Sequence, residues 1–119
     1  MPLRDAQDGE AIGFLLRTCQ EVIAFLTDTD EPGFYRNGLL ISAVCFKVSV
    51  LGEAVGRLSA GLRQRTPDIR WHAIRNMRNR LIHGYDKIDL PQVWRSAKFD
   101  VPVLLEQLSE IRDREFSES

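Results

Sequence analysis

The stretch IGFLLRTCQEVIAFL, from Ile12 to Leu26, carries apolar side chains at intervals of three and four residues. This spacing places them on one face of an α-helix, because an α-helix turns once every 3.6 residues. The pattern predicts a helix from about Asp5 to Leu26 with one buried stripe. The Asp, Thr, Pro and Gly residues that follow, from Asp28 to Gly33, predict a turn.

Three further segments show the same rhythm and predict helices: about Tyr35 to Leu62, about Asp68 to His83, and Asp89 to Ala97. Gly84 is expected to end the third helix in the left-handed conformation. Pro102 predicts that the final helix is either kinked or restarted with Asp100 as its cap. No strand-like alternation of useful length is present. The fold class is therefore predicted to be all-α, a small antiparallel helical bundle of four to five helices.

Two glycines four residues apart, Gly52 and Gly56, lie on the second predicted helix. Because they lack side chains, they would let another helix approach closely, although each costs an isolated helix about 1 kcal/mol relative to alanine. Trp71, Trp94 and Phe99 are expected to lie in the core.

The chain has 119 residues, of which 44% are hydrophobic and 28% charged. These values fit one ordinary globular domain, spanning residues 1–119, and argue against a disordered chain. The longest apolar stretch, Leu39 to Phe46, is too short to cross a bilayer. The segment from Met1 to Glu10 lacks the basic start and apolar middle of a secretory leader. We therefore expect a cytoplasmic protein that does not bind membranes.

Cys19 and Cys45 have no Cys-x-x-Cys spacing, and the two histidines are His72 and His83. Neither a disulfide framework nor a tetrahedral zinc site is indicated. The cysteines are expected to be small buried apolar residues, and the function to need no metal or cofactor.

Positive charge is concentrated in the middle of the chain, although the whole chain has a net charge of −1. Residues 57–80 contain seven arginines and one acidic residue, Asp68, whereas the segments on either side are both negative. Arginine suits phosphate recognition, because its planar guanidinium donates paired hydrogen bonds. The alternative is that these arginines pair with the acidic flanks across the fold.

The segment RNMRNRLIHGY, residues 75–85, places Arg78, Asn79, His83 and Tyr85 close together. Five residues turn a continuous helix by about 140°, so Arg78 and His83 would point to different faces unless the helix loosens at its end. We expect Gly84 to provide this loosening. A histidine at a helix C-terminus would also be favoured in its protonated form by the helix dipole.

These four residues match the R-x4-H-x-Y motif, and the chain thereby resembles the HepT-like proteins, the toxins of the HEPN domain class. Three longer blocks carry the same resemblance: GEAVGRLS at 52–59, TPDIRWHAIRNMRNRLIHGYDKIDLPQVW at 66–94 and DVPVLLEQL at 100–108. The resemblance implies a HEPN-like bundle that acts as a metal-independent endoribonuclease, the toxin of a type VII-like toxin–antitoxin module.

In this interpretation RNA supplies the nucleophile, its own 2′-hydroxyl, so the protein needs only proton transfer and charge stabilisation. His83 would move the proton and Arg78 would stabilise the phosphate charge in the transition state. Asn79 would orient a reacting group or the histidine, or would only bridge backbone groups. Arg75 and Arg80 are candidate RNA-backbone contacts or partners of other groups in the protein. DNA lacks the 2′-hydroxyl and should not be cut.

The resemblance also implies a homodimer whose cleft brings two copies of the motif together. A second histidine would provide an acid and a base on opposite sides of phosphorus. The implied antitoxin is an MntA-like nucleotidyltransferase that transfers AMP to Tyr85, which would add negative charge and bulk beside Arg78. Two other functions stay open: a non-catalytic helical adaptor for a nucleotidyltransferase, and a substrate-binding subunit of such an enzyme.

Overall fold

The computed structural model describes the backbone of residues 2–84 and 86–116 and the side chains of residues 6–84 and 86–116. The predicted all-α class is confirmed, because almost every described residue outside the turns lies in a helix. The Cα radius of gyration is 14.8 Å, and the molecule is elongated, with extents of 47 × 27 × 21 Å.

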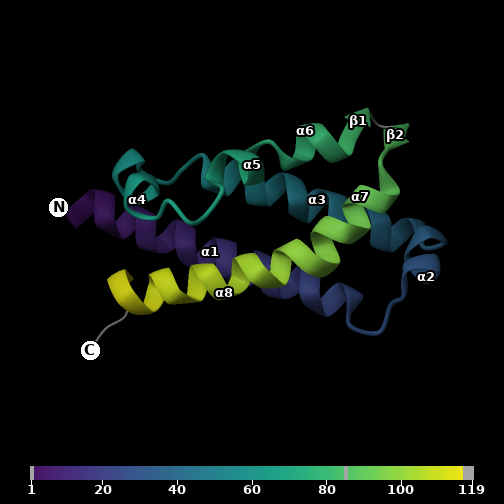
Figure 1. Cartoon of the computed structure of the whole chain (residues 1–119), viewed down its shortest axis with the longest axis horizontal. Coiled ribbons are helices and arrows are strands. Elements are labelled where there is room, and N and C mark those ends of the chain that lie inside the picture. The colour runs from purple at the N-terminus through teal and green to yellow at the C-terminus, as the bar shows by residue number, and fades with distance from the viewer. Residues whose placement is uncertain (1, 85, 117–119) are drawn as a thin grey trace.

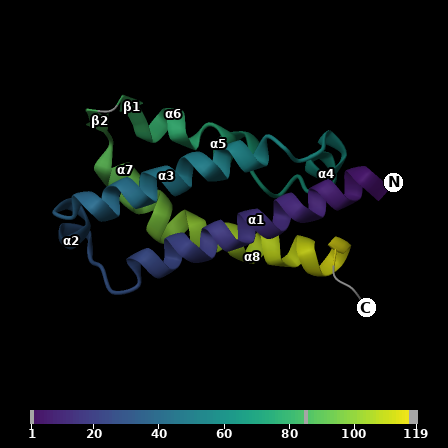
Figure 2. The ribbon, with the colours of Figure 1, turned by 180° about the vertical axis from the view of Figure 1, so that it is seen from behind.

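Three long helices form the scaffold: α1 (Pro2–Leu26), α3 (Gly38–Val55) and α8 (Val101–Ile111). Helix α1 lies beside both α3 and α8 along much of its length (Figures 1 and 2). The apolar stripe predicted for α1 is buried, with Ile12, Leu15 and Cys19 fully inaccessible to solvent. The core therefore lies where the three helices meet.

The remaining helices are short: α2 (Glu31–Tyr35), α4 (Ala60–Arg65), α5 (Trp71–Arg75), α6 (Met77–Leu81) and α7 (Leu90–Arg95). Side-chain oxygens of Asp30, Ser59 and Asp89 accept hydrogen bonds from backbone N–H groups in the first turns of α2, α4 and α7. Two segments predicted as continuous helices, 35–62 and 68–83, are each divided. The first is interrupted between Gly56 and Ser59, and the second at Asn76.

Two short antiparallel strands, which the sequence pattern did not predict, follow α6. Strand β1 (Ile82–Gly84) pairs with β2 (Lys87–Ile88), with Ile82 opposite Ile88. The backbone N–H of Asp89 donates to the Leu81 carbonyl oxygen at 2.9 Å and ties the end of α6 to the start of α7.

A π-helical turn, η1 (Ser96–Asp100), joins α7 to α8 without a break. The N–H of Val101 bonds to the Ser96 carbonyl five residues earlier, directly before Pro102, which has no N–H to donate. Asp100 does not cap α8 through its side chain, so the predicted restart is wrong and the chain passes Pro102 in a widened turn. A second such turn, η2 (Arg112–Phe116), follows α8.

Two of the three aromatic residues expected in the core are there. Trp71 and Trp94 are buried, and the Trp94 ring lies 5.6 Å from that of Phe34. Phe99 is 61% exposed, so its predicted burial is wrong. It lies on η1, where the widened turn changes which side chains face the core.

Helix α3 is long and apolar enough, by length and composition alone, to cross a membrane. It packs against α1, α5 and α6, and its buried residues include Val44, Val48 and Leu51. A core helix of this length has the same composition, so this property is weak evidence for a membrane span.

Candidate functional site

The segment containing the candidate site residues, Trp71 to Gly84, lies along one edge of the bundle (Figure 1). Trp71, Ile74, Met77 and Leu81 face inward and are buried. Asn76, with φ −94° and ψ 3°, separates α5 from α6. The segment is thus fixed by one apolar stripe, which leaves the side chains between these residues outside.

Gly52 of α3 allows this segment to lie close to the scaffold. A Cβ atom at Gly52 would lie 2.9 Å from the backbone oxygen of Arg75 and 3.4 Å from that of Ile74. No side chain fits at the first of these distances without a shift of the backbone. The close approach predicted from Gly52 is therefore present, and the element that approaches is α5.

Arg78 and Asn79 are exposed on α6. A nitrogen of the Arg78 guanidinium donates to Asn79 Oδ1 at 3.5 Å, which is the outer limit of a hydrogen bond. Asn79 is thus placed beside the arginine and can influence its orientation. The guanidinium retains most of its five donors for an external group.

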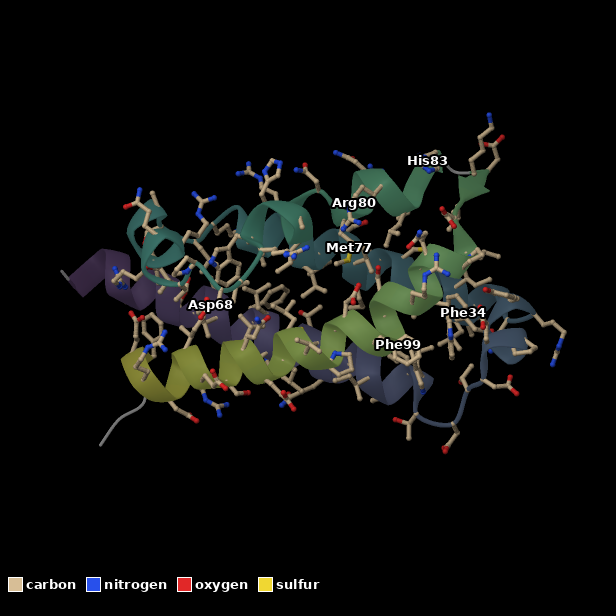
Figure 3. All side chains as sticks on the ribbon, viewed as in Figure 1. Phe34, Asp68, Met77, Arg80, His83 and Phe99 are labelled. Carbon is tan, nitrogen blue, oxygen red and sulfur yellow. The ribbon has the colours of Figure 1, made fainter. Side chains whose placement is uncertain are left out.

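His83 lies on β1, two residues beyond the end of α6, and its side chain is exposed (Figure 3). The prediction that the third helix reaches His83 is wrong, and so is the left-handed conformation expected of Gly84, because no described glycine has a positive φ. The strand pairing extends the chain at Ile82 and ends the helix instead. His83 therefore does not lie at a helix C-terminus, where the helix dipole would favour its protonated form.

The structure places Arg78 and His83 on the same short segment. The helix ends between them, at Leu81, and the chain continues as the extended strand β1, which contains His83. No hydrogen bond joins the two side chains among those found in the described part of the chain. Within residues 6–84 and 86–116 there is also no cluster of three or more His, Cys, Asp or Glu side chains arranged to hold a metal ion. Arg78 and His83 of one chain therefore offer one exposed guanidinium and one exposed imidazole.

The two candidate RNA-backbone contacts differ in their surroundings. The guanidinium of Arg75 extends to the C-terminal end of α3, where its Cζ atom is 3.6 Å from the position of a Cβ at Gly56. Arg80 donates to the Ala73 carbonyl oxygen at 3.3 Å and so bridges α5 and α6 across the break at Asn76. Arg80 and Met77 line a hollow between these helices and α8 (Figure 3).

Most of the positive charge of residues 57–80 is not neutralised within the described structure. Two arginines of this segment form ion pairs there, Arg57 with Glu53 at 3.6 Å and Arg65 with Glu115 at 2.8 Å. Only the second pair joins distant parts of the chain. Arg75, Arg78 and Arg80 have no carboxylate partner among the described side chains, so the interpretation that the acidic flanks neutralise this segment does not hold for them.

His72 and Asn76 form a contact that the sequence did not indicate, with Asn76 Nδ2 2.9 Å from His72 Nε2. Both lie on the outer side of α5, and Asn76 marks the break before α6. An asparagine inside an otherwise apolar rhythm was the available signal for that break.

Tyr85, the candidate modification site, lies outside the described residues.

The fold and site define a small all-α protein that presents an arginine and a histidine on an open edge. The profile of the family described as "Ribonuclease HepT-like" matches residues 15–111. The chain belongs to this ribonuclease HepT-like family.

Individual relatives agree with this family. A protein of Methanocaldococcus jannaschii named "Putative RNase MJ0125" is 31% identical over 111 residues, covering 93% of this chain and 94% of that protein. "Putative RNase TTE0752" of Caldanaerobacter subterraneus is 27% identical over 101 residues, covering 85% and 90%. "Probable ribonuclease HepT" of Thermococcus cleftensis is 30% identical over 70 residues, covering 59% and 64%. No solved structure matches the chain significantly.

Proposed function

We propose that the chain is a metal-independent endoribonuclease that cleaves RNA by attack of a 2′-hydroxyl on the adjacent phosphorus. The observation that carries this proposal is the segment from Arg75 to His83, where an exposed imidazole follows exposed guanidinium groups that have no carboxylate partner. Such a segment attracts a phosphodiester and provides an imidazole, a side chain that can act as a general acid or base.

In the proposed reaction, Arg78 binds a non-bridging oxygen of the phosphate. Its positive charge stabilises the extra negative charge that develops on the pentacoordinate phosphorus. His83 either takes the proton from the 2′-hydroxyl or gives one to the departing 5′-oxygen. The products are a 2′,3′-cyclic phosphate and a 5′-hydroxyl. Asn79, next to Arg78, holds the guanidinium in position.

The reaction needs both an acid and a base, and one chain supplies one histidine, His83, to the part of the segment that follows Arg78. We therefore propose a homodimer in which a twofold axis near β1 brings two copies of Arg78 and His83 to one phosphodiester. The open position of both side chains leaves space for a second copy. A dimer that is dissociated without unfolding should lose cleavage.

We further propose that the protein is the toxin of a toxin–antitoxin module and that an MntA-like nucleotidyltransferase neutralises it. Transfer of AMP to Tyr85, two residues after His83, would place a negative phosphate where the substrate phosphate binds. Co-expression with such a partner should then add the mass of AMP, and Tyr85→Phe should prevent both the addition and the loss of toxicity.

The direct test is cleavage of labelled RNA by the purified chain with EDTA present. Arg78→Ala and His83→Ala should each lower the cleavage rate by about 10²–10⁴-fold, the usual contribution of a proton-transfer or charge-stabilising group. Because both side chains are exposed, the midpoint of thermal unfolding should not change. His72→Ala is the matched control, since His72 is the other histidine of the same segment and should not be required.

Three results would contradict the proposal. One is full activity of the His83→Ala variant, which would remove the proton-transfer role. Another is a product with a 3′-hydroxyl end, which this chemistry cannot give. The third is equal cleavage of a substrate in which the nucleotides are 2′-deoxy, because the nucleophile would then be absent.

A further inference from the structure

A hollow of about 730 Å³ lies between the N-terminal half of α1 and the C-terminal end of α3, away from β1. Its lining includes Phe14 and Arg17 from α1, Ala54 from α3 and Arg57 from the turn that follows α3. Gly13 also lines it, and the space beside Gly13 is free, because a Cβ there would have only the end of the Arg17 side chain within 4 Å. A hollow of this size can accept a group as large as a nucleobase.

Phe14 faces this hollow rather than the core. It is 41% exposed, whereas its neighbours Leu15 and Leu16 are buried. The guanidinium carbon of Arg17 lies 5.9 Å from the centre of the Phe14 ring. An exposed aromatic ring beside a cation is the arrangement on which unpaired bases stack in proteins that bind single-stranded nucleic acid.

A line of arginines connects the hollow to the proposed active site. Arg75 lies three residues before Arg78, and its guanidinium reaches Gly56 of α3, next to Arg57. Arg57 and Arg17 then line the same hollow. Helix α3 lies between α1 and α5, so the line crosses three adjacent helices (Figure 2). Such a line can follow the phosphates of a strand that is longer than the active site.

Two acidic side chains lie near this line. Glu53 is 3.6 Å from Arg57, but both side chains are more than 70% exposed, so their pairing is weak and a phosphate can replace it. Glu10 also lines the hollow. Its carboxylate cannot bind phosphate but can accept hydrogen bonds from the amino groups of a base.

We infer that this hollow is a second RNA-binding site, which holds one unpaired base of a single-stranded substrate several nucleotides from the cleaved bond. The base stacks on Phe14, and phosphates on either side of it contact Arg17 and Arg57. This inference rests on the proposed ribonuclease function, since the strand reaches the hollow from Arg78 and Arg75.

The test measures binding of fluorescent single-stranded RNA of about 4 and about 12 nucleotides, within the range of known single-strand site sizes. His83→Ala serves as the parent protein so that the RNA stays intact. The longer RNA should bind the parent more tightly than the shorter one. Phe14→Ala should lower the affinity for the longer RNA by about tenfold and leave the affinity for the shorter one unchanged. Phe14→Leu should do the same, because leucine keeps the apolar bulk but has no flat ring.

Phe99→Ala is the matched control, since Phe99 is an exposed phenylalanine on η1 that lies outside the arginine line. It should bind both RNAs as the parent does. Replacing Arg17 and Arg57 together by glutamine should lower the slope of log affinity against log salt by about 1.4, or about 0.7 for each lost phosphate contact.

Equal binding of the longer RNA by the Phe14→Leu, Phe99→Ala and parent proteins would overturn the inference. Cleavage by the protein with an intact His83, measured in parallel, separates the two proposals. If it cleaves RNA and the Phe14 variants bind normally, only the second site is wrong. If it binds but does not cleave RNA, the ribonuclease proposal fails, and the binding data still decide whether the hollow takes a base.

Discussion

The scaffold helices α1, α3 and α8 and the segment from Trp71 to Gly84 are built in different ways. The scaffold helices are 25, 18 and 11 residues long and are held together by fully buried side chains such as Leu15, Leu51 and Leu108. The segment consists of two helices of five residues each and a strand of three, and its outer side carries arginines.

Helices of five residues are too short to be stable alone in water. The segment therefore takes its shape from the scaffold, through its buried stripe and the contact of its backbone with Gly52. Stability and chemistry therefore lie in separate residues. Substitutions in the scaffold should change stability, those on the outer side of the segment should change activity, and those at the contact should change both.

The largest effect on stability is expected in the scaffold. Leu51→Ala removes a fully buried side chain from α3 and should lower the free energy of unfolding by about 2–5 kcal/mol. Leu39→Ala on the same helix is the control. Because Leu39 is 84% exposed, this substitution should change the free energy of unfolding by less than about 0.5 kcal/mol. Urea unfolding measures the free energy of unfolding of both variants. Equal losses of this free energy would contradict the assignment of Leu51 to the core.

The second effect is a dependence on pH that comes from the scaffold. Burial raises the pKa of the Cys19 thiol from 9.0 to about 12. The folded state keeps its proton while the unfolded state loses it, so stability is full below the unfolded pKa and is lost as pH rises toward the folded pKa. Between about pH 9 and about pH 11 this group should lower the free energy of unfolding by about 1.4 kcal/mol per pH unit. Cys19→Ala should show a shallower decline than the unaltered protein over the same range.

The third effect tests the contact between the two regions. Gly52→Ala places a Cβ 2.9 Å from the Arg75 carbonyl oxygen and should cost about 1–3 kcal/mol through overpacking. Because α5 must move, RNA cleavage should fall as well. Gly38→Ala is the control on the same helix, since a Cβ there meets nothing within 4 Å. Retained stability and cleavage in Gly52→Ala would show that the segment does not depend on this contact.

The smallest effect separates two arginines of the segment. Arg75→Gln should weaken RNA binding and lower the salt slope by about 0.7, with unchanged unfolding. Arg80→Gln loses the bond to the Ala73 carbonyl and should lower the free energy of unfolding by less than about 1 kcal/mol. Anisotropy titrations with RNA at several salt concentrations, together with urea unfolding, distinguish the two variants. A loss of RNA affinity in Arg80→Gln alone, with a loss of stability in Arg75→Gln alone, would contradict the roles assigned to these arginines.

The helical class and the buried face of α1 could be predicted because both follow from the spacing of apolar residues. The close approach at Gly52 was also readable, since only glycine leaves room for a neighbouring backbone. The break at Asn76 and the hairpin after Leu81 were not predicted. The hairpin depends on pairing between two elements too short to show an alternating pattern: the Asp89 N–H bonds to the Leu81 carbonyl oxygen, and Ile82 pairs with Ile88.

The candidate site was predicted unevenly for the same reason. Arg78, Asn79 and His83 were found from their order along the chain, and Asn79 does lie beside Arg78. The different surroundings of Arg75 and Arg80 could not be predicted, because one reaches Gly56 and the other the Ala73 carbonyl. Phe14 was overlooked, although its position beside the apolar stripe of α1 was a signal that it faces outward.

Helix periodicity and side-chain chemistry are local properties, so the order of residues along the chain was enough to predict the all-α class, the buried stripes and the candidate arginines and histidine. Three features could be seen only in the folded chain: His83 lies on a strand, Arg80 is bound to the backbone at Ala73, and Arg17 and Arg57 line the same hollow. These features arise from contacts between separate elements, which the periodicity of a single segment does not specify.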